Sequence, residues 1–161
     1  MKYIILTAAL GGLLFQGQPV LAGPPLVNFS TIKADAVGQQ LESSIIWKGS
    51  AIQDATGVAV AFRKKISFAA PPVHATLHLF ADARYLLWVN GKYVERGPAR
   101  FQPNGPEYDS VNLDSKLQAG ENVLALLVVG NLSGGKVMRH APGLTAVLEV
   151  DGQEVARTDA S

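Results

Sequence analysis

The chain has 161 residues, with 14 lysines and arginines against 13 aspartates and glutamates, and it contains no cysteine. This balance of charge argues against nucleic acid or an anionic membrane as a partner, because both attract proteins that carry an excess of Lys and Arg on one surface. Without cysteine the chain has no disulfide framework, thiolate metal site or cysteine nucleophile.

The first 22 residues have the composition of a secretory signal peptide. Lys2 precedes an apolar run at residues 3–15, and Val20-Leu21-Ala22 resembles the small-residue pattern of a cleavage site. A membrane anchor is the alternative, but the run is shorter than the roughly 20 apolar residues that span a bilayer. We therefore predict cleavage after Ala22 and export to a periplasm or to the extracellular space.

The next segment, residues 23–44, is interpreted as a leader or linker. Within it, residues 34–43 could form about two helical turns, although Gly38 lowers their helical propensity. Residues 45–161 have a different pattern and are expected to form one domain, which is long enough to bury a core of its own.

Apolar and polar residues alternate along short segments after residue 45, which is typical of strands with one buried face. Asn90-Gly91 separates two of these segments and predicts a tight hairpin turn, because both residues tolerate positive φ. The segment 123–129 is apolar throughout and predicts a strand that is fully buried. The expected strands are residues 45–47, 58–68, 73–80, 84–90, 92–96, 108–113, 123–129, 144–150 and 154–158.

This series of strands, with turn-rich connections and little helix, predicts an all-β fold of the antiparallel jelly-roll sandwich kind. The sequence stops at Ser161, shortly after an expected strand. Because a sandwich often returns its last strand beside its first, we expect the domain to lack its last strand.

No residue pattern predicts a catalytic or metal site. His74 and His78 lie four residues apart, but on a strand that spacing spans roughly 13 Å, which is too far for one metal ion. The acidic residues are scattered, so a facing pair from different strands, as glycoside hydrolysis requires, is neither indicated nor excluded. No Gly-x-Ser-x-Gly elbow is present. We assign no catalytic residue and no metal ligand.

Several aromatic and polar side chains suit sugars, because aromatic rings stack on pyranose C–H groups and planar polar groups hold adjacent hydroxyls. Structural roles compete with this interpretation. Trp88 lies on a central strand and is expected in the core, and Tyr108 fits a sandwich-corner tyrosine. Arg96 could pair with Asp109 to fix the loop between them. The candidate carbohydrate-binding residues are Arg96, Arg100, Asn104, Tyr108 and Asp109.

Several motifs carry a resemblance to a known family. They are FADARYLLWVNGK at residues 80–92, RGPAR at residues 96–100, Tyr108-Asp109, and LQAGENVLA at residues 117–125. These motifs, and the upstream Ile46-Trp47, resemble the N-terminal β-sandwich domains of bacterial α-L-rhamnosidases and related glycoside hydrolases. The resemblance extends over residues 45–161, and galactose-binding-like domains of several glycosidase families share parts of it.

The resemblance implies a galactose-binding-like jelly roll, and a parent protein that acts on rhamnose-containing glycans through carboxylates in a separate helical barrel. No position in this chain matches the catalytic motif. We therefore expect an exported accessory domain, carbohydrate-binding or structural, that lacks the catalytic domain of its parent. A short chain that is itself a hydrolase and a module that binds a non-carbohydrate partner are the alternatives. No cofactor is expected, apart from a structural calcium ion held by loop oxygens, as similar sandwiches often have.

Overall fold

A computed structural model describes residues 21–22, 32–47, 58–82, 84–99, 106–130 and 143–159 of the chain. The predicted signal peptide falls almost wholly outside these ranges, so its cleavage and export stay predictions. The described elements are β1 (Leu21–Ala22), α1 (Ala36–Glu42), β2 (Ile46–Trp47), β3 (Ala59–Phe68), β4 (Ala75–Asp82), β5 (Arg84–Val89), β6 (Lys92–Gly97), β7 (Asp109–Asn112), β8 (Gly120–Val129), β9 (Gly143–Val150) and β10 (Gln153–Arg157).

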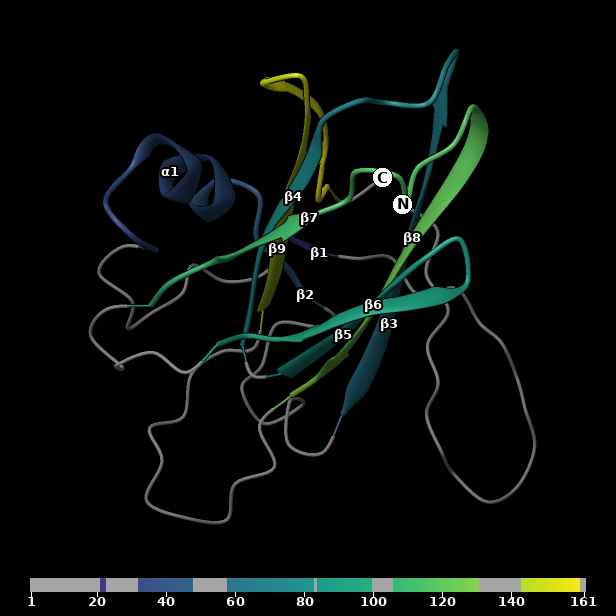
Figure 1. Ribbon diagram of the computed structural model, residues 1–161. Coiled ribbons are helices and arrows are strands. Elements are labelled where there is room, and N and C mark those ends of the chain that lie inside the picture. Colours follow the sequence, from purple (N-terminus) through teal and green to yellow (C-terminus); the bar gives the residue numbers. More distant parts are fainter. Residues whose placement is uncertain are drawn as a thin grey trace, which may run out of the picture.

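The strands form two antiparallel sheets that face each other, and this arrangement confirms the predicted all-β sandwich (Figure 1). The four-stranded sheet has the order β3-β8-β5-β6, and we call it sheet A. The six-stranded sheet, called sheet B, has the order β1-β2-β9-β4-β7, with β10 also paired to β9. The expected strands agree with the observed ones to within a few residues.

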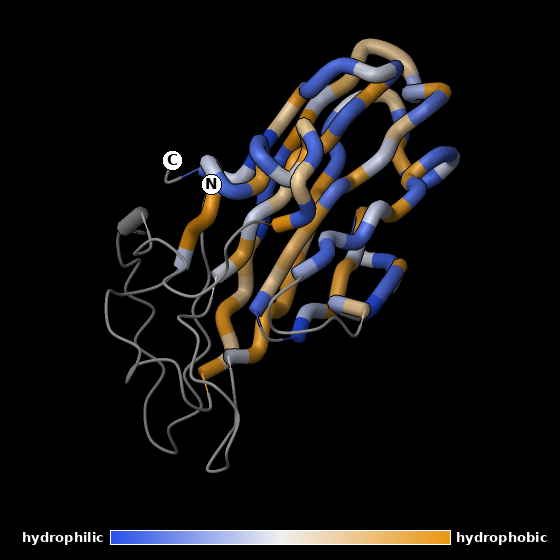
Figure 2. Tube along the Cα trace, turned by 90° about the vertical axis from the view of Figure 1, so that its left-hand side faces the viewer, coloured by the Kyte–Doolittle hydropathy of each residue, from blue (hydrophilic) through white to orange (hydrophobic). Residues whose placement is uncertain are grey.

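The core lies between the two sheets. It is built from every second residue along the strands, namely those whose side chains point inward. On β5, Tyr85, Leu87 and Val89 are buried, while the residues between them are partly exposed. The same alternation of apolar and polar residues is visible along most strands (Figure 2). Each buried aliphatic side chain stabilises the fold by about 1.5–3 kcal/mol. Trp47 of sheet B packs against Phe62 of sheet A, with ring centroids 6.1 Å apart, and so joins the two layers.

Strand β8 differs from its predicted burial. Leu124, Leu126 and Val128 are buried, but the alternate residues of this apolar run are only partly buried. The prediction of a fully buried strand was therefore wrong, because an apolar run also fits a strand with one buried face and one apolar outer face. The outward residues of β8 are Val123, Ala125, Leu127 and Val129.

Helix α1 packs on the outer face of sheet B. Ile32 and Leu41 are fully buried against Phe80 of β4 and Val147 of β9, in a cluster separate from the main core. The hydroxyl of Thr145 donates a hydrogen bond of 2.6 Å to the carbonyl of Leu41. Part of the segment interpreted as a leader or linker is thus packed against the sandwich.

The start of α1 explains why glycine occurs within a helix. Asp35 caps the helix by accepting a hydrogen bond of 2.8 Å from the backbone N–H of Gly38. The carbonyls of Ile32 and Lys33 lie so close to Gly38 that any Cβ there would overlap them. The close approach of the preceding backbone therefore outweighs the poor helical propensity of glycine at this position.

The Asn90-Gly91 turn has the predicted geometry, with φ of 51° and 77° at the two residues. The Asn90 side chain also ties the hairpin to β8. Its Oδ1 accepts a hydrogen bond of 2.8 Å from the N–H of Val123, and its Nδ2 donates one of 2.8 Å to Asn122 Oδ1. The β5–β6 hairpin is therefore held rigidly on the rest of sheet A.

Candidate functional site

The corner after β6 is closed by Tyr85 and Asp109. The Tyr85 hydroxyl donates a hydrogen bond of 2.6 Å to Asp109 Oδ2, and the backbone N–H of Ala99 donates one of 3.3 Å to Asp109 Oδ1. A Cβ at Gly97 would overlap both the Tyr85 ring and this carboxylate, so glycine is required there. Burial, and then the Asp109 carboxylate, raise the pKa of Tyr85 far above its usual range. Asp109 therefore fixes the corner through Tyr85 rather than through the expected pairing with Arg96.

Tyr108, the chain neighbour of Asp109, directs its side chain to the outer face of sheet B, next to α1. Its hydroxyl donates a hydrogen bond of 3.1 Å to Asp35 Oδ2, and its ring meets the His78 ring edge-on at 5.6 Å. Desolvation, followed by the bond to Asp35, raises the pKa of Tyr108. The expectation of a corner tyrosine at this position was wrong, because Tyr85 fills that role and Tyr108 joins β7 to the helix cap.

The five candidate binding residues do not form one described site. Arg100 and Asn104 lie outside the described residues, so their role stays a prediction. Arg96 is exposed on sheet A, Tyr108 lies over sheet B, and Asp109 is engaged within the corner. Of the described three, Arg96 is the one whose polar group faces solvent without an ion pair or hydrogen bond inside the described ranges.

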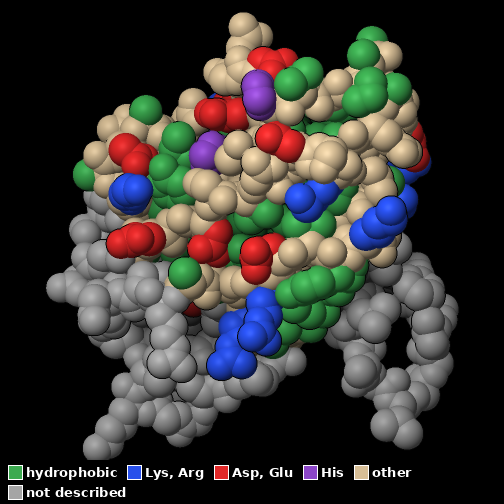
Figure 3. All heavy atoms as spheres, in the orientation of Figure 1, with side chains coloured by type: hydrophobic (Ala, Val, Ile, Leu, Met, Phe, Trp, Pro, Cys, Tyr) green, Lys and Arg blue, Asp and Glu red, His purple; other side chains and the backbone are tan. Residues whose placement is uncertain are grey.

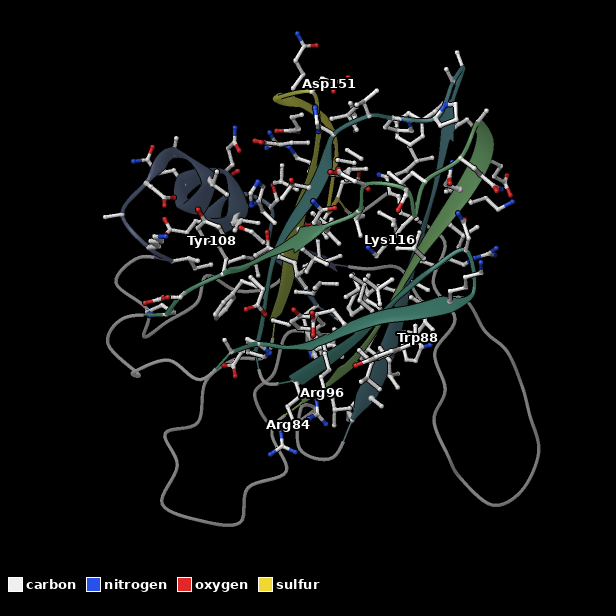
Figure 4. All side chains as sticks on the ribbon, in the orientation of Figure 1. Arg84, Trp88, Arg96, Tyr108, Lys116 and Asp151 are labelled. Atoms are coloured by element: carbon white, nitrogen blue, oxygen red, sulfur yellow. The ribbon has the colours of Figure 1, made fainter. Side chains whose placement is uncertain are left out.

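The outer side of the β5–β6 hairpin is the surface best suited to a ligand, and we call it the hairpin face. The strand register places Leu86 opposite Arg96 and Trp88 opposite Tyr93, and two-residue alternation puts Arg84 on the same side. Figure 4 shows Arg84, Trp88 and Arg96 on the side of sheet A that faces away from sheet B. The hairpin face consists of Arg84, Leu86, Trp88, Tyr93 and Arg96.

Trp88 is partly exposed on this face, so the expectation that it belongs to the core was wrong. Its neighbours Leu87 and Val89 point inward and are buried, and alternation directs Trp88 outward. The rings of Trp88 and Tyr93 meet edge-on, with centroids 6.2 Å apart, and Tyr93 is 55% exposed. The two aromatic rings thus form an apolar surface on which a sugar ring can stack.

The hairpin face continues onto β8 and is bordered by positive charge. Ala125 and Leu127 lie opposite Trp88 and Leu86 and extend the apolar surface. Figure 3 shows hydrophobic side chains gathered beside a group of Lys and Arg side chains over this part of sheet A. Guanidinium groups offer several N–H donors in a fixed plane, which suits hydroxyl or carboxylate oxygens.

Sequence reasoning named Arg96 as a binding candidate but assigned Trp88 to the core, so it did not bring the two together, and it missed Arg84. The alternation along the strand was enough to group Arg84, Leu86 and Trp88, since every second residue of a strand points to the same face. The pattern did not reveal the register between β5 and β6, which shifts at a bulge between Leu87 and Trp88. This register determines which β6 residues join the face.

A shallow groove that is open to solvent lies between β3 and β10. Core side chains such as Phe62, Leu126 and Leu148 line it, and Lys64 crosses it to Asp159, with 2.6 Å between Nζ and Oδ2. The groove offers an apolar lining without the convergent polar groups that orient a small ligand.

A polar cluster lies on the outer face of sheet B. Ser110 Oγ is 2.8 Å from His78 Nδ1, and His78 Nε2 is 3.5 Å from Glu149 Oε2. Within the described ranges no group of three or more His, Cys, Asp or Glu residues could hold a metal ion. The calcium ion implied by the resemblance would be held by loop oxygens, which include backbone carbonyls, so that ion stays a prediction.

Among solved structures the chain is similar to a GH78 family rhamnosidase of Bacillus sp. GL1. The two are 37% identical over 73% of this chain and 12% of that protein, with a TM-score of 0.64. The chain is similar to a β-sandwich domain of α-L-rhamnosidases. This rhamnosidase-like sandwich spans only a small part of the length of that enzyme. Comparison with family models and with curated proteins found no match.

Two further structures share the fold of the rhamnosidase-like sandwich. An α-L-rhamnosidase of Streptomyces avermitilis, solved with L-rhamnose, is 21% identical over 89% of this chain and 13% of its own, with a TM-score of 0.58. A lectin of Pleurotus ostreatus, solved with GalNAc, is 22% identical over 88% of this chain and 37% of its own, with a TM-score of 0.51. The described ranges hold no helix of the length and apolar character that a membrane crossing requires.

Proposed function

We propose that the rhamnosidase-like sandwich is a carbohydrate-binding accessory domain of an exported α-L-rhamnosidase-like hydrolase, and that the reaction takes place on another part of a longer protein. The likeness to the Bacillus rhamnosidase supports the parent enzyme, and the fold shared with a lectin is compatible with sugar binding. The observation that carries the proposal is the hairpin face, where the Trp88–Tyr93 pair lies beside exposed arginines.

Binding on the hairpin face uses stacking and hydrogen bonds together. The apolar side of a sugar ring lies on Trp88, and the guanidinium of Arg96 donates hydrogen bonds to hydroxyl oxygens. Because this face is an open sheet surface rather than a pocket, it buries less of a ligand than an enclosed site does. We expect weak binding, with a Kd on the order of 1 mM, which corresponds to about 4 kcal/mol.

Titration of the chain with L-rhamnose, galactose and short rhamnose-containing oligosaccharides, followed by calorimetry and NMR, tests the proposal. We expect Trp88→Ala to weaken binding about tenfold or more with an unchanged circular dichroism spectrum, because truncation removes the stacking surface. The matched control is Val73→Ala, since Val73 is an apolar side chain 69% exposed and lies outside the hairpin face. No binding of any of these saccharides to the wild-type chain would leave the domain a structural role only.

The loop after the corner supplies a second test of the sequence prediction. Arg100→Ala is expected to leave the fold intact and to weaken saccharide binding, because Arg100 follows the corner that begins at Arg96. The same titrations measure the effect. Full binding by Arg100→Ala together with weak binding by Trp88→Ala would confine the site to the hairpin face and remove Arg100 from it.

A further inference from the structure

Positive charge is concentrated around the hairpin face although the whole chain is nearly neutral. Arg84 and Arg96 are exposed, and neither makes an ion pair or a side-chain hydrogen bond inside the part of the chain that the structure describes. Arg63 on β3 lies in the same cross-strand row as Ala125 and Trp88, on the same side of the sheet. Three guanidinium groups therefore lie on the same face of sheet A as the aromatic pair.

Several other cations of the described surface are matched by carboxylates, although Lys92 and Lys116 have no such partner among the described residues. Lys64 pairs with Asp159, Lys65 with Glu121, and Arg157 with Glu154. The carboxylate next to the hairpin arginines is that of Glu95, and its Oε1 accepts a hydrogen bond of 3.0 Å from the backbone N–H of Arg96. The guanidinium groups on the hairpin face are thus left available for an anion from outside the chain.

The register sets how such an anion would lie relative to the rings. Arg96 is opposite Leu86, so Arg84 and Arg96 are diagonal neighbours whose Cα atoms lie about 7–8 Å apart. Two long side chains at that separation can reach one carboxylate. Arg84 lies four residues from Trp88, roughly 13 Å along the strand. Because both arginine side chains are long, their guanidinium groups can reach a saccharide residue linked to a ring that lies on Trp88.

We propose that the hairpin face selects acidic saccharides, in which a neutral sugar on Trp88 is linked to a uronic acid whose carboxylate binds Arg84 and Arg96. This inference rests on the proposed carbohydrate-binding function and names the ligand class of the same face. Arginine suits the task because its planar fork matches the two oxygens of a carboxylate. Neutral saccharides bind the same aromatic surface without this added contact.

The test compares three disaccharides that differ at one residue: rhamnose linked to galacturonate, to galactose, and to sulfated galactose. Each is titrated into the chain at low and high salt, with NMR shifts as the readout. The uronate is expected to bind roughly tenfold more tightly than the neutral sugar at low salt, and high salt should reduce the difference. Arg84→Gln and Arg96→Gln should each lower this preference, while the charge-matched control Lys116→Gln should keep it.

The outcomes separate the inference from the function on which it rests. Equal affinity for the uronate and the neutral disaccharide overturns the inference and leaves carbohydrate binding intact. A preference for the uronate that survives in both arginine variants also overturns it, as does tighter binding of the sulfated sugar than of the uronate. Binding of none of the three disaccharides removes the proposed function itself, and the inference with it.

Discussion

The contrast between Tyr85 and Trp88 shows how position on one strand decides the role of a side chain. The two residues share β5 and differ in parity. Tyr85 points into the sandwich and gives its hydroxyl to Asp109, whereas Trp88 points outward beside Tyr93. Only the outward residue can meet a ligand. A hydroxyl-bearing aromatic residue on the inward side needs a buried partner, and Asp109 provides it.

The Tyr85 hydroxyl makes the fold sensitive to high pH. In the unfolded chain tyrosine loses its proton near pH 10, whereas burial raises the pKa of folded Tyr85, so the folded state binds more protons above about pH 10. Stability conferred by the neutral phenol is therefore present below about pH 10 and falls as pH rises further. We expect Tyr85→Phe to lower the free energy of unfolding at neutral pH by about 1–2 kcal/mol, because Asp109 loses a hydrogen-bond donor. Above about pH 10 the stability of this variant should fall less steeply with pH than that of the wild-type chain. Urea denaturation across this pH range measures both effects, and an unchanged alkaline slope would count against the assignment.

How far the binding face could be predicted depends on particular residues. The alternation of Arg84 to Val89 is enough to place Trp88 and Arg84 together on one side of a strand. Trp88 was expected in the core because tryptophan is a large apolar residue, although its place in the alternation points it outward. The bonds of Asp109 and Tyr108 were not predictable, because their partners Tyr85 and Asp35 lie 24 and 73 residues away.

Helix α1 adds a second, small hydrophobic cluster to the outside of sheet B. Leu41 and Ile32 cover Phe80 and Val147, which would otherwise be apolar residues on a solvent-facing surface. The sequence allowed two helical turns at residues 34–43 but did not predict their docking, since Leu41 meets Thr145, 104 residues further along the chain. An element whose contacts are few and local to one face can open without unfolding the remainder.

Leu41→Ala tests whether α1 opens independently. The substitution leaves a cavity at a fully buried position and is expected to destabilise the docked helix by about 2–4 kcal/mol. Hydrogen exchange should accelerate in α1 and leave β3 and β8 slow, because those strands belong to the main core. Gln39→Ala, at an exposed position of the same helix, serves as the control. Equal acceleration in β8 would mean that the helix and the sandwich unfold as one unit.

At the scale of the whole molecule, the two tryptophans report on different events. Trp47 is 2% exposed and packs between the sheets, whereas Trp88 lies on the hairpin face. A single domain of this size is expected to unfold in one cooperative transition. The fluorescence emission of Trp47 should therefore change only when the sandwich unfolds. The fluorescence emission of Trp88 should also change when a ligand binds.

Trp88→Phe isolates the core signal. The variant is expected to show the emission of a buried tryptophan, no change on addition of saccharide, and a denaturation curve that coincides with the one from circular dichroism. The wild-type chain should add a saccharide-dependent change in the folded state. A saccharide response that persists in Trp88→Phe would place the ligand near the core instead of on the hairpin face.

The overall fold was more predictable than the site, because alternation along each strand is a local property. The positions of most strands and the hairpin turn at Asn90-Gly91 followed from it. The pairing order of the sheets did not, since β3 meets β8 across more than 50 residues and β4 lies between β9 and β7. Long-range pairing depends on the mutual fit of surfaces that no single segment encodes.

Among the described strands, β3 pairs with β8 alone and so presents an open edge of ten residues. An edge of that length invites the same edge of another copy to add to it, which leads to aggregation. The middle of β3 carries Arg63, Lys64 and Lys65, and two copies paired antiparallel about this point would bring six cations together. Lys64 and Lys65 have carboxylate partners in Asp159 and Glu121, so it is chiefly the repulsion between the two Arg63 side chains that would oppose such association.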